Sequence, residues 1–399
     1  MACRTEPCCS PRGSSSPDEM IHLNNAGSAL PAPGVLEVVR SYLEEEARVG
    51  GYELADRSAP AIEQAYRDIA GLVGARPRNI AVVESATEGF ARALDAFDFS
   101  PGDLVLTTRN DYVSNQLAFL SLARRRGVEV AHLAERPEGG ADPDDLERRI
   151  RARRPVLVSA THVPTSSGLV QPVAEIGSVC RAHDVPYLVD ACQSVGQMPV
   201  DVGSIGCDFL CATGRKFLRG PRGTGFLFVA DRMLEGDRHP LLPDLRGATW
   251  TEAGAFELAP DARRFEYWER SYALLLGLGA AAAHASSTGL EEIARVARSH
   301  ADRLREALAE IDGVQVLDRG PELCAIVTAR VGEWEAQALV EVLRERGVNT
   351  SAVSADSARL DFDARGVRSA LRLSPHFTTT AEEVDRAIAI LRDAVSTAA

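Results

Sequence analysis

The chain has 399 residues, of which 25% are charged and 45% are hydrophobic, and its formal net charge is −13. This length exceeds what one small core needs, and it predicts a large domain together with a smaller one. The acidic balance argues against a protein that binds along nucleic-acid phosphates, because such binding needs an excess of basic groups. A small anionic ligand stays open, since it needs only a local site.

The start of the chain predicts a disordered tail over residues 1–19. This stretch is rich in Pro, Ser and charge and has no apolar run of the secretory type. The chain has no run of about 18 apolar residues, so we expect no membrane segment. Eight cysteines occur without Cys-x-x-Cys spacing, which argues against a zinc site or a disulfide framework. We expect no metal and a cytoplasmic location.

Short β-branched runs alternate with amphipathic helical stretches from about residue 33 to residue 230. Nearly continuous apolar strands, each followed by a helix, predict an α/β fold with a mostly parallel sheet of seven strands, covered on both faces. Ligands of such sheets bind at the carboxyl ends of the strands. The expected strands are residues 79–85, 103–108, 128–133, 155–160, 186–190, 207–213 and 223–229.

The pattern changes after a loop-rich stretch near residues 235–268. A long helical region at about 270–311 is followed by short strands, a further helix and a last helix from about residue 380. This order predicts a smaller α+β domain at the C-terminus. We therefore expect a large domain over 20–268, whose first segment lines the pocket, and a small domain over 269–399.

Lys216 is the single lysine of the chain, so the other 43 of its 44 basic residues (44 − 1) are arginine. GC-rich coding accounts for the missing lysines but not for the retention of this one. A primary amine can become a neutral nucleophile, whereas a guanidinium cannot. Lys216 is therefore the first candidate for a catalytic group.

Polar residues gather where two predicted strands end. Asp190 ends one strand and Gln193 follows it, while the next strand runs into Thr213, Arg215 and Lys216. Carboxyl ends of parallel strands lie at one edge of a sheet, so we expect these side chains to meet there.

A helix start at residues 85–88 adds a possible anion cradle. The free backbone N–H of Ala86 and the hydroxyl of Thr87 can hold a phosphate there. A lysine that forms a Schiff base, a carboxylate for a ring nitrogen and a helix start for a phosphate are the parts that pyridoxal phosphate needs. The sequence thus predicts this cofactor.

The stretches VDACQSVGQMPVD and CATGRKFLRGPRGTGFLFV resemble the class V aminotransferase family of fold-type I enzymes, close to the cysteine desulfurases. The resemblance spans about residues 21–395. It implies that Lys216 is the Schiff-base lysine, that Asp190 pairs with the ring nitrogen and that Gln193 binds the ring hydroxyl. The implied phosphate ligands are the N–H of Ala86 and the side chains of Thr87, Thr213 and Arg215.

Three further stretches extend the resemblance. TTRNDYVSNQ implies that Tyr112 stacks on the cofactor ring, where the desulfurases carry histidine, and THVPTSSGLVQP places Thr165 where the family has asparagine. SALRLSPHFTTTAEEVDRAI implies that Arg372 binds the α-carboxylate of a small amino-acid substrate. HLNNAGSAL places Asn24, Asn25, Ala26 and Gly27 in the segment that lines the substrate pocket, with Asn25 and Ala26 as the expected substrate-binding residues.

The stretch LRGATW resembles the place where the family's partner subunit reaches the phosphate. It implies that Thr249 completes the site of a neighbouring copy. A homodimer with shared active sites follows from this resemblance.

The expected reaction depends on a missing cysteine. Desulfurases carry a cysteine on a mobile loop before the strand of Arg372, and residues 347–371 contain none, while Cys324 lies upstream in an apolar strand pattern. This argues against a persulfide-forming desulfurase. The chain resembles instead the family's non-desulfurase branch of ergothioneine- and lincosamide-type biosynthesis, also in the stretch GGYELAD at 50–56. The resemblance implies a C–S β-lyase that acts on an S-substituted L-cysteine or its sulfoxide.

In that reaction Lys216, freed by Schiff-base exchange, removes the Cα proton and the Cβ substituent leaves. Other outcomes of Cα activation stay open, namely decarboxylating oxidative deamination, epimerisation and transamination. From another class, a binding or scaffold protein that keeps the fold without catalysis also stays open. Its retention of Lys216, Asp190 and Arg372 favours the enzyme.

Overall fold

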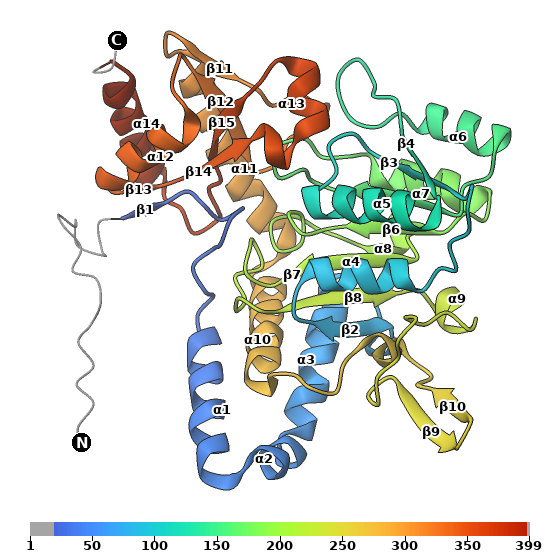
Figure 1. Ribbon diagram of the computed structural model, residues 1–399. Helices are drawn as coiled ribbons and strands as arrows, with labels where there is room; N and C mark the ends of the chain where they lie inside the picture. Colours follow the sequence, from blue (N-terminus) through green and yellow to red (C-terminus); the bar gives the residue numbers. More distant parts are fainter. Residues whose placement is uncertain (1–19, 397–399) are drawn as a thin grey trace, which may run out of the picture.

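A computed structural model of the chain describes residues 20–396, and the tail predicted over residues 1–19 lies outside the described residues (Figure 1). The larger part is built on a seven-stranded sheet with the order β2-β8-β7-β6-β5-β3-β4. Its strands are β2 (Ile80–Val83), β3 (Leu104–Thr107), β4 (Glu129–His132), β5 (Leu157–Thr161), β6 (Tyr187–Asp190), β7 (Phe209–Thr213) and β8 (Gly225–Val229).

The sheet is parallel from β4 to β7, whereas β8 runs antiparallel to both of its neighbours. The predicted α/β fold with a mostly parallel sheet of seven strands is confirmed. Because β6 and β7 are parallel neighbours, with Asp190 paired to Cys211, their carboxyl ends lie at the same edge. The residues that follow both strands are thereby brought together.

Helices cover both faces of this sheet (Figure 1). The strands are apolar throughout because alternate side chains enter two different cores: Tyr187 and Val189 of β6 pack in one, and Leu188 packs in the other. The helices of this part are α1 (Val35–Val49), α2 (Gly51–Arg57), α3 (Ala59–Leu72), α4 (Ala86–Asp95), α5 (Val113–Arg126), α6 (Pro143–Ala152), α7 (Val173–Ala182), α8 (Val202–Ile205), α9 (Asp231–Leu234) and α10 (Tyr272–Thr288), with the 3-10 turns η2 (Pro77–Asn79) and η3 (Ala262–Phe265).

The smaller part has an antiparallel sheet of four strands with the order β11-β12-β15-β14. Strand β1 (Ile21–His22), from the start of the described chain, joins this part by pairing in parallel with β13 (Val348–Asn349). The other elements are β11 (Val314–Val316), β12 (Val327–Val331), β14 (Ser351–Ser354), β15 (Ser369–Leu373), α11 (Leu290–Ala309), α12 (Ala336–Glu345), η4 (Ala355–Ser357), α13 (Arg359–Arg365) and α14 (Ala381–Ser396).

The change from one core to the other falls inside α11 rather than at residue 268. Helix α10 packs against α1 and α3, and Ile293 of α11 still belongs to the core of the larger part. From Ala297 onward, α11 contributes to the core of the smaller part, which also includes Ile21 and Leu23. Because α10 is apolar on most sides, it is buried within the large core.

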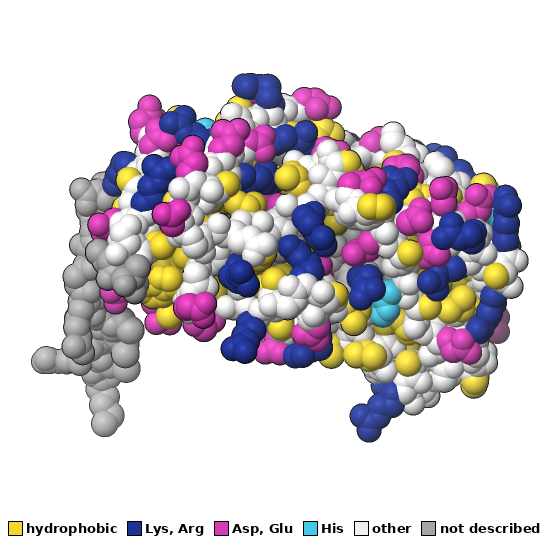
Figure 2. All heavy atoms as spheres, turned by 90° about the horizontal axis from the view of Figure 1, so that it is seen from above, with side chains coloured by type: hydrophobic (Ala, Val, Ile, Leu, Met, Phe, Trp, Pro, Cys, Tyr) yellow, Lys and Arg dark blue, Asp and Glu magenta, His cyan; other side chains and the backbone are white. Residues whose placement is uncertain are grey.

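Among residues 20–396 no single helix has the length and apolar character of a membrane span. Helices α10 and α11 pass that test only as a pair, which is bent by 82°. On the face shown in Figure 2, positive and negative side chains are interspersed, with hydrophobic side chains scattered among them. That face has charge of both signs rather than one broad field.

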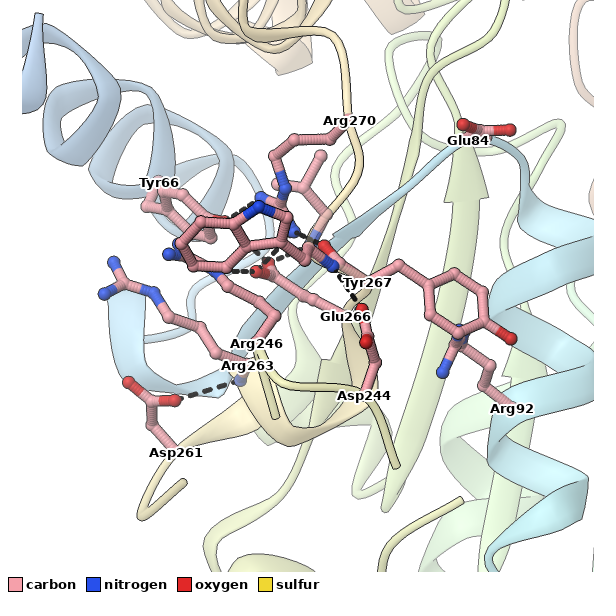
Figure 3. Close-up of polar contacts among 12 residues, drawn as sticks. Tyr66, Glu84, Arg92, Asp244, Arg246, Asp261, Arg263, Glu266, Tyr267 and Arg270 are labelled. Carbon is pink, nitrogen blue, oxygen red and sulfur yellow. Dashed lines mark hydrogen bonds and ion pairs between the residues drawn. The ribbon is translucent and has the colours of Figure 1, made fainter. Parts of the chain in front are cut away.

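A projecting hairpin is made of β9 (Ala248–Glu252) and β10 (Ala255–Leu258), and a buried ionic cluster holds its base (Figures 1 and 3). Glu266 is fully buried and forms ion pairs with Arg246 at 3.2 Å and Arg270 at 2.6 Å. The hydroxyl of Tyr66 donates to Glu266 Oε1 at 2.6 Å and accepts from Arg270 Nη1 at 2.7 Å. Arg246 and Arg270 lie on either side of the hairpin in sequence, so the cluster ties both of its ends to α3.

Candidate active site

Lys216 lies in the turn that follows β7, at the carboxyl edge of the sheet. Its side chain is buried, and its Nζ lies 5.6 Å from the centroid of the Tyr112 ring. Burial lowers the pKa of the Lys216 amine, and the neighbouring Arg215 and Arg372 lower it further, against the opposing effect of Cys192 and Asp190. The amine is therefore closer to its neutral, nucleophilic form than an exposed lysine would be.

The turn around Lys216 is fixed from several sides. The N–H of Gly214 donates to Thr224 O at 2.8 Å, and a Cβ at Gly214 would lie only 2.2 Å from Thr224 Oγ1, so this position has room for glycine alone. His376 Nε2 donates to Phe217 O at 2.9 Å, and the two rings stack. Burial lowers the pKa of His376 to about 4, so this imidazole is neutral and serves the packing of the turn.

Asp190 ends β6 and is buried, with one hydrogen bond to each carboxylate oxygen. The N–H of Cys192 donates to Oδ1 at 2.9 Å, and Asn115 Nδ2 donates to Oδ2 at 2.9 Å. Among the described residues no ion pair involves this carboxylate. Lys216 is near enough to interact with it electrostatically, as are the groups of the same edge.

Arg372 on β15 is a buried guanidinium whose partners are neutral. Its Nη1 donates to Thr165 O at 3.1 Å and to Thr165 Oγ1 at 2.7 Å, and its Nη2 donates to Asn24 Oδ1 at 3.5 Å. Its Nε is buried without a partner among residues 20–396. Burial lowers the pKa of Arg372 to about 10, and Arg215 adds to this effect. A buried cation without a carboxylate is costly, so this position fits an anionic ligand.

Gln193 joins Arg372 through Thr165. Its Nε2 donates to Thr165 Oγ1 at 3.3 Å and to Ala26 O at 3.2 Å, while its Oε1 is buried with no partner in the described chain. A buried amide oxygen normally has a hydrogen-bond donor. The unsatisfied Oε1 of Gln193 therefore indicates that a polar ligand binds beside Asp190.

The start of α4 forms a compact backbone cradle. Ser85 caps the helix by accepting from the N–H of Glu88 at 3.1 Å, which leaves the first-turn N–H groups of Ala86 and Thr87 free of helical partners. A Cβ at Gly225 would lie 3.0 Å from the Ser85 carbonyl carbon and 3.1 Å from Ala86 N, so β8 passes directly beside this helix start. Such a helix start fits a phosphate.

Thr213 and Arg215, predicted as phosphate ligands, are bound within the chain. Thr213 Oγ1 donates to Thr224 O at 3.2 Å, at the β8 side of the cradle. Arg215 Nη1 donates to Gly27 O, and the pKa of its half-buried guanidinium is lowered by burial. Their role toward a phosphate stays a prediction.

The segment after β1, which the sequence places at the substrate pocket, lies beside Gln193 and Arg372. Asn25 is buried, and its Nδ2 donates to Ser374 O at 2.7 Å. This hydrogen bond holds the segment against the end of β15. Ala26 contributes its carbonyl to Gln193, and its N–H donates to Ser374 Oγ at 3.0 Å. The side chain that reaches Arg372 is Asn24, one position earlier.

Thr249 is not brought to Lys216 within the chain. It lies on the exposed hairpin strand β9, opposite Glu257 on β10. The predicted role in a neighbouring copy is therefore untested by the arrangement of one chain.

Two polar residues of the site had no assigned role in the sequence, namely Asp111 and Asn115. The only available signal was spacing: Asp111 and Asn115 are four residues apart at a helix start, which puts them on one face. Neither spacing nor composition reveals that Asn115 reaches Asp190, 75 residues away.

The described cysteines are poor nucleophiles as they stand. Cys180, Cys207, Cys211 and Cys324 are buried, and Cys192 is only partly exposed. Burial, followed by the Asp190 charge, raises the pKa of the Cys192 thiol to about 12, and burial raises that of Cys324 to about 12. Among residues 20–396 no group of His, Cys, Asp and Glu is arranged to hold a metal ion.

A buried lysine amine, a buried aspartate, an open amide, an unpaired guanidinium and a helix-start cradle at one sheet edge fit pyridoxal phosphate and an amino-acid carboxylate. The fold and this site define a pyridoxal-phosphate-dependent enzyme. More specifically, the chain belongs to the aminotransferase class-V family, whose model matches residues 21–387.

Two relatives support this assignment, and one solved structure shares the fold. A probable cysteine desulfurase of Methanothermobacter thermautotrophicus is 29% identical over 372 residues, covering 90% of this chain and 91% of the relative. The cysteine desulfurase IscS of Salmonella schwarzengrund is 28% identical, covering 94% and 92%. The apo structure of a cysteine desulfurase from Thermococcus onnurineus NA1 superposes with a TM-score of 0.87 at 23% identity, covering 95% and 96%.

The expected C–S β-lyase is wrong, and so is the argument against a desulfurase. Relatives that match 90% to 94% of the chain are named cysteine desulfurases. The absence of cysteine from residues 347–371 therefore does not exclude a desulfurase.

Proposed function

We propose that this enzyme removes the sulfur atom from L-cysteine and passes it to an acceptor thiol, leaving L-alanine. The observation that supports this most directly is the unpaired, buried Arg372 beside the buried amine of Lys216, which suits a small α-amino acid held by its carboxylate. The names of the full-length relatives support cysteine as that amino acid.

Each residue of the site has a part in this proposal. Lys216 Nζ would hold the cofactor covalently and then move the proton at the substrate's Cα, since burial favours the neutral form of its amine, which can accept a proton. Asp190 holds a proton at the ring nitrogen, and Tyr112 covers the ring. When bound, pyridoxal phosphate supplies a ring that withdraws electrons from Cα. Arg372, held by Thr165 and Asn24, orients the substrate through its carboxylate.

We assign binding of the phosphate and of the ring hydroxyl to the remaining predicted residues. The N–H of Ala86 and the side chains of Thr87, Thr213 and Arg215 would bind the phosphate. Gln193 offers its open amide oxygen at the ring hydroxyl. These assignments are proposals that follow the placement of each residue at the sheet edge.

The acceptor thiol comes from a second molecule in this proposal. Residues 347–371 lack cysteine, and the pKa values of the Cys192 and Cys324 thiols are raised by burial. The overall change balances as L-cysteine plus R–SH giving L-alanine plus R–S–SH. The Cβ–S bond breaks, a sulfur–sulfur bond forms on the acceptor, and Cβ takes up a proton, so no oxidant is needed.

The test is incubation of the full chain, loaded with pyridoxal phosphate, with L-cysteine and dithiothreitol as the acceptor thiol. We expect alanine and sulfide in equal amounts, because the thiol releases the transferred sulfur as sulfide. Mass analysis of the amino acid and a colorimetric sulfide assay give the two yields. Pyruvate and ammonia in place of alanine would contradict the proposal, and D-cysteine is the control substrate.

We further propose that two copies form a homodimer in which Thr249 of each completes the site of the other. The hairpin that carries Thr249 projects from the chain and exposes Trp250 at 78% and Phe256 at 51%, and the Glu266 cluster fixes its base. Exposed apolar side chains of this size suit an interface. We expect a dimer mass by light scattering in solution, and Trp250→Glu should shift the mass toward that of a single chain. A monomeric wild type at micromolar concentration would refute the shared site.

A cytoplasmic location and a role in small-molecule biosynthesis stay predictions from the sequence.

A further inference from the structure

Asn115, in the first turn of α5, lies between two buried carboxylates. Its Nδ2 donates to Asp190 Oδ2 at 2.9 Å and to Asp111 Oδ1 at 2.9 Å. A side-chain amide nitrogen carries two hydrogens, so both are used in this bridge. Asp111 and Asn115 belong to the stretch between β3 and α5, whereas Asp190 ends β6. The bridge therefore connects that stretch to the carboxylate of Asp190.

Asp111 is anchored on all sides. Besides Asn115, its oxygens accept from Thr107 Oγ1 at 2.6 Å, from Thr161 Oγ1, and from the N–H of Tyr112 at 2.8 Å. Three of these four donors reach Oδ1 and one reaches Oδ2, and such a set of donors suits an ionised carboxylate. Burial raises the pKa of Asp111, the hydrogen bonds from Thr107, Thr161 and Asn115 lower it, and the charge of Asp190 raises it again.

We propose that Asn115 and Asp111 are positioning residues for Asp190. Asp190 has one hydrogen bond on each oxygen, from Cys192 N and from Asn115 Nδ2. Together they fix the rotation of the carboxylate, whereas the Cys192 bond alone leaves it free to turn. Asp111 in turn fixes the amide of Asn115 and adds a second negative charge behind Asp190. That charge favours the cationic form of whatever Asp190 binds.

This inference rests on the proposed pairing of Asp190 with the cofactor ring nitrogen. The titratable groups around the two carboxylates are the thiols of Cys192 and Cys211 and the amine of Lys216. Burial raises the pKa of both thiols, which keeps them protonated, so the carboxylate pair is the main local source of negative charge.

The first test measures binding of pyridoxal phosphate to the cofactor-free full chain by titration of its visible absorbance. We expect Asn115→Ala to raise the dissociation constant about tenfold, as for the loss of one hydrogen bond to a charged group. Gln116→Ala is the matched control, because the neighbouring amide on the same helix bonds Thr108 and His132 instead of a carboxylate. It should bind the cofactor within about twofold of the wild type. Thermal unfolding of each cofactor-free variant separates binding from stability.

A second readout uses Asp111→Asn, which keeps the shape and removes the charge. The midpoint of the pH-dependent change in the bound cofactor's absorbance should move to lower pH by about one unit, because a nearby negative charge that favours the protonated form is lost. An effect on folding alone would not move this midpoint. This variant also keeps the proposal testable if Asn115→Ala fails to fold.

Asp190→Ala distinguishes the inference from its premise. If Asp190→Ala loses the cofactor while Asn115→Ala binds it as the wild type does and Asp111→Asn leaves the midpoint unchanged, the positioning role is refuted and the Asp190 assignment stands. If Asp190→Ala itself binds the cofactor normally, the placement of Asp190 is refuted and the inference with it.

Discussion

Replacing Lys216 by alanine is expected to lower kcat for alanine formation from L-cysteine by about a thousandfold or more. The amine is the single lysine of the chain, and no other buried amine can take its place. The covalent attachment of the cofactor should also be lost. Borohydride reduction followed by mass measurement of the intact protein detects that attachment, which should be present in the wild type and absent from Lys216→Ala.

The control for Lys216→Ala is Arg222→Ala, which removes an exposed charge from the same loop. It should keep kcat within about twofold of the wild type, as is usual for exposed positions. Lys216→Arg keeps a positive charge but offers no nucleophilic amine, and it should resemble Lys216→Ala. Retention of the reduced mass adduct in Lys216→Ala would show that another residue holds the cofactor.

Replacing Arg372 by alanine is expected to raise KM for L-cysteine about a hundredfold, with a smaller fall in kcat. The guanidinium is buried among neutral partners and has an unpaired Nε, so the substrate carboxylate is its natural counter-ion. Steady-state kinetics across substrate concentrations separate the two constants. Arg372→Lys should recover part of the affinity, because it restores the charge without the two-pronged geometry.

Cysteamine, which lacks the carboxylate, provides the decisive comparison. Wild type should strongly prefer L-cysteine over cysteamine, and Arg372→Ala should lose most of that preference, because the missing group and the missing partner act on the same contact. An undiminished preference in the variant would remove Arg372 from the substrate site. Pyridoxal phosphate binding and thermal unfolding of the variant serve as controls for its integrity.

The sheet could be predicted from the sequence because its signal is local. Alternating apolar side chains enter two cores, so each strand appears as an unbroken apolar run, as in residues 187–189. Residues that directly follow such strands, Asp190 and Lys216 among them, must then lie at one edge. This reasoning required no knowledge of distant contacts.

Other features depend on contacts that no local pattern reveals. Asn24 bonds Arg372 while Asn25 bonds Ser374 O, because a turn at residues 24–28 directs the two side chains to different partners. Asn115 acquires its place only when α5 docks beside β6. The prediction of a β-lyase is wrong because the absence of cysteine from residues 347–371 does not decide a reaction that a thiol of a second molecule can complete.

The change of core inside α11 has a mechanical consequence. The chain passes between the two parts of the molecule at two places: residues 24–34, and α11 between Ile293 and Ala297. The first connection begins at Asn24, whose side chain accepts a hydrogen bond from Arg372. The connection between the two bodies therefore starts beside the residue proposed to bind the substrate. Because Asn24 pairs with Ser374 next to β15, whereas Thr165 follows β5 of the larger body, a rotation of the smaller body would change the contact between Arg372 and Thr165. Cutting the chain at residue 268 would separate α10 from α1 and α3 and expose their apolar faces, so the two bodies are not separable modules.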